Sequence, residues 1–227
     1  MSFQPRPLQY PPIFPFDKSL VLDLTFDERS GAKAYDRSGK GNHGTISGAT
    51  WVTGRRGAAL SFNGLNNYVE VAHSTSLNFL SAMTIEMRIK PAVDMYADWV
   101  GLIDKRNGGA AFALYYHKTN KYLYLYINGG AVVGSSQRTF YAGTWYHIVA
   151  TAKSGSLDNH LYINGIEDSP NIGARDFITN TAPVKIGILF NLSLPFSGII
   201  EKVRIYNQAL SAAESKQLYE SEIMLVQ

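Results

Sequence analysis

The sequence contains no cysteine, which excludes disulfide bonds, thiol catalysis and cysteine-ligated zinc. This absence does not identify the cellular compartment, because extracellular domains without disulfides are common. No stretch reaches the ~18 apolar residues of a membrane span, and the first residues lack the basic start and apolar core of a secretory signal. Charge is also sparse, with a formal net charge of +3 and scattered basic residues. We therefore expect neither a membrane span nor a nucleic-acid partner.

Proline is scarce except at the start of the chain, where residues 1–17 hold five of the nine prolines. This concentration forbids a helix and favours an extended, polyproline-like conformation. The same segment is rich in aromatic and aliphatic residues, so we interpret it as an arm that precedes a domain formed by residues 18–227. The arm either packs on its own domain or on a neighbour, which would serve self-assembly, or it is a flexible leader.

Helical periodicity is rare after the arm, where short apolar runs alternate with Gly and Asn turns. Residues 83–90 and 145–152 are examples with the length and β-branched composition of strands. About a dozen such runs without helices between them favour an antiparallel sandwich or barrel. The exception is near the C-terminus, where Ser211 and Glu214 form a capping box that predicts a helix near residues 211–221.

Several motifs occur in a fixed order between residues 19 and 220. They are the segment "LDLTFDERSGAKAYDRSGKGNHGTISGATWVTGRRGAALSFNGLNNYVEVA", followed by "MTIEMRIKP", "GTWYHIVAT", "LYINGIE" and "FSGIIEKVRIYNQALSAAE". Together they resemble the concanavalin A-like, laminin G-like jelly-roll domains, which are also labelled pentraxin-like. The resemblance implies two stacked antiparallel sheets of about six or seven strands. The fold class that we expect is therefore all-β, an antiparallel β-sandwich with a short C-terminal helix.

Trp145, Tyr146 and His147 stand together at the head of one predicted strand, and this grouping fits catalysis, sugar binding or packing. The resemblance implies that Trp145 is an inner-face anchor, since bulky aromatic residues dominate sandwich cores. Catalysis by His147 would require a nucleophile or a carboxylate as its partner, and the strand offers none nearby in the sequence. We therefore expect packing roles for Trp145 and His147.

Glycosidases of this architecture place two carboxylates on one strand face, because retaining hydrolysis needs an acid and a nucleophile about 5 Å apart. Residues 83–90 contain the single acid Glu86, whose same-face neighbours are Thr84 and Arg88. Glu86 is expected to be a surface or salt-bridged residue. We predict no catalytic residues and a chain that is not an enzyme; a glycoside hydrolase is the alternative.

Oxygen ligands and flexible glycines occur together in residues 34–45. Asp36 and Asn42 carry side-chain oxygens, and the glycines let backbone carbonyls turn inward, as Ca²⁺ requires. The domains that this chain resembles often hold one structural calcium there, and the resemblance implies Glu201 as the partner acid, where many relatives have Asp. Asp27 is a further candidate ligand. The alternative is an Asx turn, in which Asp36 and Asn42 bond their own backbone.

Tyrosine alternates with aliphatic residues in β-strand-like residues 122–127, so Tyr122, Tyr124 and Tyr126 share one face. If the aliphatic face enters the core, the three rings stand outside, where an aromatic row suits sugar stacking or protein contact. The alternative is that a second layer, such as residues 1–17 or another strand, covers the rings.

The function that these patterns favour is recognition. We expect a non-enzymatic, lectin-like module that binds carbohydrate or a protein surface, as in cell adhesion, and that works outside a cell or on the surface of a particle. The alternative is a structural subunit of a virion, fibre or surface layer, in which residues 1–17 reach into a neighbour. The aromatic arm and the missing signal-peptide pattern favour this alternative.

Overall fold

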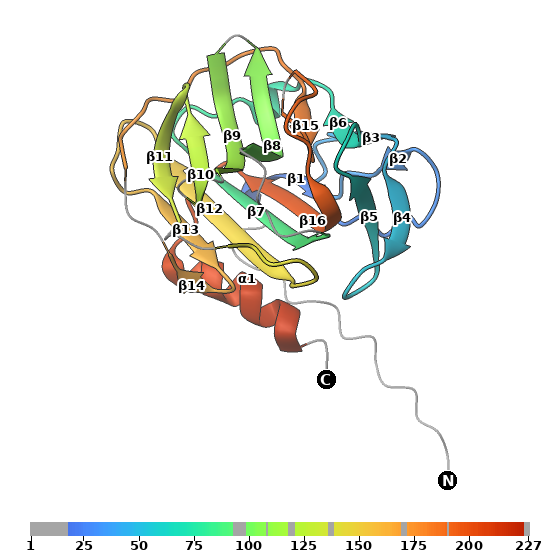
Figure 1. The fold of residues 1–227 in the computed structure, drawn as a ribbon. Helices are drawn as coiled ribbons and strands as arrows, with labels where there is room; N and C mark the ends of the chain where they lie inside the picture. The colour runs from blue at the N-terminus through green and yellow to red at the C-terminus, as the bar shows by residue number, and fades with distance from the viewer. Residues whose placement is uncertain are drawn as a thin grey trace, which may run out of the picture.

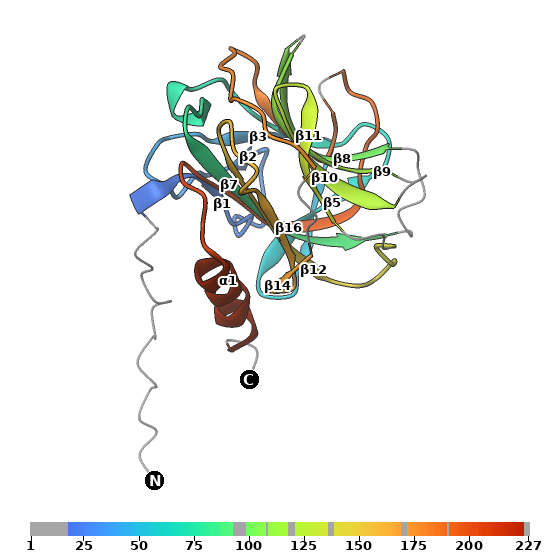
Figure 2. The same ribbon diagram turned by 90° about the vertical axis from the view of Figure 1, so that its left-hand side faces the viewer.

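The computed structural model describes residues 18–92, 99–107, 109–117, 121–135, 139–168, 172–189 and 191–224. These residues form two antiparallel eight-stranded sheets stacked as a sandwich, with one α-helix outside it (Figures 1 and 2). The prediction of an all-β sandwich with a C-terminal helix is confirmed, although the sheets have eight strands rather than six or seven. The predicted arm lies outside the described residues. No helix in the described ranges has the length and hydropathy to cross a membrane.

The first sheet, sheet A, has the strand order β14-β13-β12-β7-β16-β5-β4, and β1 also pairs with β16. Its central strands β7 and β16 are the longest in the fold, with ten residues each. The strands of sheet A are β1 (Leu20–Leu24), β4 (Thr50–Thr53), β5 (Ala58–Asn63), β7 (Ala82–Pro91), β12 (Tyr146–Lys153), β13 (His160–Ile163), β14 (Ile166–Glu167) and β16 (Ser197–Tyr206).

The second sheet, sheet B, has the order β11-β10-β9-β8-β15-β6-β3-β2. Strands β8 to β11 follow one another along the chain as a meander, and positive φ angles at Asn128 and Gly129 allow the tight turn between β10 and β11. A short 3₁₀ helix, η2 (Thr75–Leu77), precedes β7. The strands of sheet B are β2 (Lys33–Ala34), β3 (Gly44–Ser47), β6 (Tyr68–Val71), β8 (Trp99–Asn107), β9 (Gly109–His117), β10 (Tyr122–Ile127), β11 (Gly130–Gly134) and β15 (Val184–Ile186).

The core lies between the two sheets and follows from the alternation of side chains along each strand. In β10, Leu123, Leu125 and Ile127 are buried, whereas the tyrosines between them are half-buried. Strand β7 is buried on both faces, because its apolar residues enter the core and its polar residues face a second layer. That second layer is the C-terminal helix, which covers part of the outer side of sheet A.

The helix α1 (Ala212–Met224) packs outside sheet A (Figure 2). Its start is the predicted capping box, in which the Glu214 carboxylate accepts from the backbone N–H and the hydroxyl of Ser211 at 2.7 Å. Leu218 is 1% exposed and belongs to a separate apolar cluster on the outer side of sheet A. The other members of this cluster are Leu20, Val149, Tyr162, Tyr206 and Leu210.

The segment that joins β16 to α1 is fixed to sheet A by one buried hydroxyl. Thr84 Oγ1 donates to the carbonyl of Gln208 at 2.7 Å and accepts from the N–H of Leu210 at 2.9 Å. Two backbone groups of the segment therefore depend on a single side chain for their hydrogen bonds.

The substitution Thr84→Val should lower the free energy of unfolding by about 2 kcal/mol, because valine keeps the shape but leaves a buried N–H and a buried carbonyl without partners. Urea denaturation measures the change. Thr50→Val, at an exposed strand position, is the matched control and should shift stability by less than about 0.5 kcal/mol. Equal effects of the two substitutions would contradict a tether at Thr84.

Candidate functional site

The face of sheet B that points away from the core carries a continuous layer of rings, which we call the tyrosine face. The predicted row of three tyrosines on β10 forms its centre. Strand pairing extends the layer, because Tyr115 on β9 lies opposite Tyr124, and Trp99 on β8 lies opposite His117. All of these side chains except Tyr115 are half-buried. The tyrosine face consists of Trp99, Tyr115, His117, Tyr122, Tyr124 and Tyr126.

The rings of the tyrosine face contact one another at their edges. The ring centroids of Tyr122 and Tyr124 are 5.5 Å apart, and those of Tyr124 and Tyr126 are 6.0 Å apart. Tyr115 lies 4.4 Å from Tyr126 and 4.9 Å from Trp99. Each such pair contributes about 0.5–1.5 kcal/mol, so the rings hold fixed positions. Burial raises the pKa of Tyr115, and a hydrogen bond with Tyr126 raises it further, which keeps this hydroxyl protonated.

A loop between β15 and β16 covers one side of the tyrosine face. Leu189 and Leu194 of this loop pack with Trp99 and Tyr115, and the N–H of Gly101 donates to the carbonyl of Leu194 at 2.8 Å. The close approach requires glycine, since a Cβ at Gly101 would lie 2.6 Å from Leu189 Cδ2. A second layer therefore covers Tyr115, which is 5% exposed, whereas the three tyrosines of β10 keep an exposed part.

The predicted roles of Trp145 and His147 differ from their places in the structure. Tyr146, not Trp145, enters the core, because the strand alternation turns Trp145 toward the surface, where it is half-buried with the Lys90 ammonium 5.4 Å from its ring centroid. His147 is buried on the outer side of sheet A, beneath α1. Its packing role is therefore in a polar layer rather than in the apolar core.

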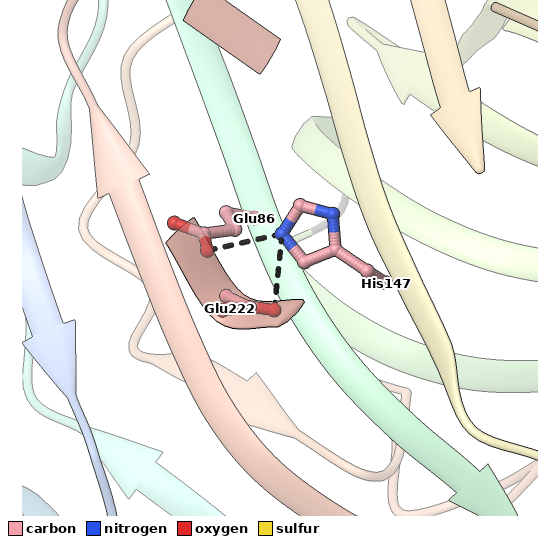
Figure 3. Close-up of side chains that lie close together, drawn as sticks. All are labelled: Glu86, His147 and Glu222. Carbon is pink, nitrogen blue, oxygen red and sulfur yellow. Dashed lines mark hydrogen bonds and ion pairs between the residues drawn. The ribbon is translucent and has the colours of Figure 1, made fainter. Parts of the chain in front are cut away.

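His147 meets two carboxylates under α1 (Figure 3). Its Nε2 lies 3.1 Å from Glu86 Oε1 and 3.8 Å from Glu222 Oε2. The three residues come from β12, β7 and α1, and each is at most 3% exposed. The sequence does not show this cluster, because its members are joined by strand pairing and helix docking. Glu86, which we expected to be a surface or salt-bridged residue, is salt-bridged and fully buried.

Cations from β7 and β16 surround these carboxylates. Lys202 Nζ lies 2.6 Å from Glu222 Oε1 and 3.6 Å from Glu86 Oε1, and Arg204 Nη1 lies 3.7 Å from Glu86 Oε2. Arg88 pairs with Glu222 as well. Burial alone would raise the pKa of Glu86, but Lys202 and Arg204 hold it well below its usual range. Burial lowers the pKa of His147, so its ring is neutral.

Glu86, His147 and Glu222 are metal-ligand types whose ligand atoms lie within 4.8 Å of one another. The surrounding charge argues against a metal, because the two carboxylates already pair with Arg88, Lys202 and Arg204, and these cations would repel a divalent ion. Burial also keeps both carboxylates from substrate. The cluster is therefore a structural ion network that joins α1 to sheet A.

The predicted calcium loop places its acid in the middle of a hydrogen-bonded turn. Asp36 Oδ1 accepts from the N–H groups of Asp23 and Ser38 at 2.9 and 3.0 Å. Asp36 Oδ2 accepts from the Ser38 hydroxyl at 2.8 Å and the Asn42 N–H at 2.9 Å. These four donors use the lone pairs of the carboxylate, as in the Asx-turn alternative. The Asn42 amide nitrogen donates to the carbonyl of Val21 at 2.7 Å.

The other two candidate calcium ligands have partners of their own. Glu201 Oε2 accepts from Arg88 at 2.8 Å, and its Oε1 accepts from the N–H of Arg56 at 2.6 Å. Asp27 Oδ1 accepts from the N–H of Ala58 at 3.3 Å. None of these contacts joins Glu201 or Asp27 to Asp36. As arranged, the four residues do not fit a calcium ion, which needs several oxygens directed at one point.

Residues 62–214 match the sequence model of a family described as the concanavalin A-like lectin/glucanases superfamily. No curated protein matches the chain.

Solved structures share the fold. The binding domain of Paraclostridial Mosquitocidal Protein 1 has a TM-score of 0.68 at 19% identity over 91% of this chain and 53% of that chain. Trypanosoma rangeli sialidase has a TM-score of 0.66 at 17% identity over 91% and 33% of the two chains. Domain 4 of AbnA, a GH43 extracellular arabinanase from Geobacillus stearothermophilus in complex with arabinotriose, has a TM-score of 0.65 at 19% identity over 88% and 98%. This chain thus spans about half of the first, a third of the second and nearly all of the third.

The substitution Glu86→Gln should lower the free energy of unfolding by about 3–5 kcal/mol, because it leaves buried Lys202 and Arg204 without their shared countercharge. Chemical denaturation at pH 7 measures the change. The matched control is Glu70→Gln, which removes an acid paired with Lys185 at the surface and should cost less than about 1 kcal/mol. Similar losses in both variants would show that the Glu86 charge is not the support of the network.

Thermal unfolding in chelator and in millimolar calcium tests whether the Asp36 loop binds calcium. Because Asp36 is fully engaged by protein donors, we expect melting temperatures that agree within about 1 °C. A bound calcium at 100 times its dissociation constant would instead add about 2.7 kcal/mol, a rise of roughly 5–10 °C. Such a rise, abolished by Asp36→Ala, would establish the metal site in place of the turn.

Proposed function

The chain belongs to the concanavalin A-like lectin/glucanase superfamily, and from the tyrosine face we propose that it is a non-catalytic module that binds carbohydrate. Aromatic rings present apolar area to the C–H groups of a sugar, and their polar tips meet its hydroxyls. Such modules work where glycans are found, at the outside of a cell or particle. We include no calcium in this proposal, because the Asp36 carboxylate is engaged by protein donors.

The observation that carries the proposal is the half-buried state of Tyr122, Tyr124 and Tyr126. Contact with neighbouring rings fixes their orientation, while a part of each ring stays accessible. Fixed rings lose little conformational entropy when a ligand binds. An aromatic row held in place on a sheet is therefore a surface against which the C–H groups of sugar units can pack.

One of the solved structures of the same fold supports a carbohydrate ligand. The arabinanase domain is in complex with arabinotriose and has nearly the length of this chain. Its likeness to this chain is one of fold, so the sugar that this chain takes is a matter for experiment. If no saccharide binds but a protein binds through the same rings, the ligand is a protein.

The placement of the acids supports binding without cleavage. Retaining glycosidases need two carboxylates about 5 Å apart that both reach the substrate. Among the described residues, Glu86 and Glu222 come together, but both are buried and paired with cations. The tyrosine face itself includes no carboxylate.

The substitution Tyr124→Ala should weaken saccharide binding by about 1–2 kcal/mol, or roughly 5- to 30-fold, because it removes the central ring of the row. Arabinotriose and a glycan array are the probes, and titration calorimetry measures the affinity. Tyr141→Ala removes a tyrosine that is 59% exposed and lies outside the tyrosine face, so its affinity should equal that of the wild type.

Two results would contradict the proposal. One is a Tyr124→Ala variant that binds every probe as the wild type does. The other is release of shorter saccharides during incubation, because a module that only binds leaves its ligand intact.

A further inference from the structure

A groove of about 580 Å³ opens on the outer side of sheet A, on the opposite side of the sandwich from the tyrosine face. It is bordered by strands β1, β7 and β16 and by the turn between β4 and β5. Its lining contains more basic than acidic side chains. The basic ones are Arg37, Arg55, Arg56, Arg88, Lys202 and Arg204.

The acidic side chains of the groove are already matched. Asp23 Oδ1 lies 2.8 Å from Arg204 Nε, and Glu201 Oε2 lies 2.8 Å from Arg88 Nη1. Asp27 accepts from a backbone N–H. The inner cations therefore have carboxylate partners, and the acids of the lining are not available to the outer ones.

The outer cations have no such partners. Arg37 and Arg55 are exposed at the rim, and the ion pairs of the described residues include neither of them nor Arg56. Within the described part of the chain, the Arg56 guanidinium donates to the carbonyl of Ser221, at 3.3 and 3.4 Å. Burial and repulsion by Arg88 lower the pKa of Arg56, the Glu201 carboxylate opposes this shift, and Arg55 adds to it. Glu201 is shared with Arg88, so positive charge remains in excess on this side of the groove.

Backbone hydrogen bonds fix the main chain at two of these arginines. The N–H of Arg37 donates to the carbonyl of Asp23 at 2.9 Å, and the N–H of Arg56 donates to the carboxylate of Glu201. Each guanidinium has five N–H donors in a planar fork that matches the geometry of an oxyanion. Three such groups line the open groove and can converge on one negatively charged group.

We propose that this groove binds the oxyanion of an acidic saccharide, a carboxylate or a sulfate, through Arg37, Arg55 and Arg56. The oxyanion part of the assignment rests on the groove alone, and the saccharide part rests on the proposed function. Charge-assisted bonds from arginine to carboxylate or sulfate are shorter and stronger than neutral hydrogen bonds. The acidic unit binds on sheet A while the tyrosine face on sheet B stays free.

The double variant R37Q/R55Q tests the assignment, because both side chains are exposed and their loss should leave the fold intact. The probes are a sulfated oligosaccharide, a uronate oligosaccharide and a neutral oligosaccharide of the same length, at about 50 mM salt, where screening is weak. We expect at least one acidic probe to bind the wild type and the variant to bind it roughly tenfold more weakly or worse. The probe that loses affinity tells whether the group is a sulfate or a carboxylate.

The matched control is K18Q/K216Q, which removes the same charge from two exposed lysines outside the groove and should leave affinity within about twofold of the wild type. The proposal is overturned if neither acidic probe binds the wild type, or if the control loses as much affinity as R37Q/R55Q. Failure of the proposed function is a separate result, in which Tyr124→Ala does not change binding of the neutral probe while R37Q/R55Q still weakens the acidic one.

Discussion

The ion network around Glu86 is the constraint on which the outer side of sheet A depends. A carboxylate with no exposure to water is stable only if cations and donors replace its hydration. Lys202, Arg204, His147 and the Tyr206 hydroxyl, at 3.0 Å, supply that replacement. Lys202 and Arg204 in turn need cover, and Lys202 also pairs with a second acid. Helix α1 provides both, because it carries Glu222 and shields the network from solvent, so it docks by charge as well as by its apolar residues.

The sandwich could be predicted because its long strands follow simple periods. All of the dozen expected runs form strands, and the capping box marks the start of α1. The missed strands β2, β3, β4 and β14 have only two or four residues, so their periods are weak. Each is paired along a neighbouring strand. We expected Trp145 in the core, but Tyr146 lies there. The reason is similar, since the strand register, which the sequence does not show, decides which ring faces the core.

The candidate sites were predictable to different degrees. The tyrosines of β10 share a face by alternation alone, but the rings of β8 and β9 join them only through strand pairing. The Asp36 loop shows a second limit, because a Ca²⁺ site and an Asx turn use the same residue types. What separates them is the direction of backbone N–H groups. In this loop those groups point at the carboxylate, so donors of the protein already occupy both oxygens of Asp36.

The place of β16 in sheet A determines when this chain can fold. Strand β16 lies between β7 and β5 and also pairs with β1, so the last strand of the sequence joins the first to the centre of the sheet. During synthesis, β5 and β7 cannot be joined in sheet A until residues 197–206 have left the ribosome. Contacts between such distant segments make folding slow, and strand edges left open in the meantime can pair with other chains. Sheet A is therefore completed only after β16 has been translated.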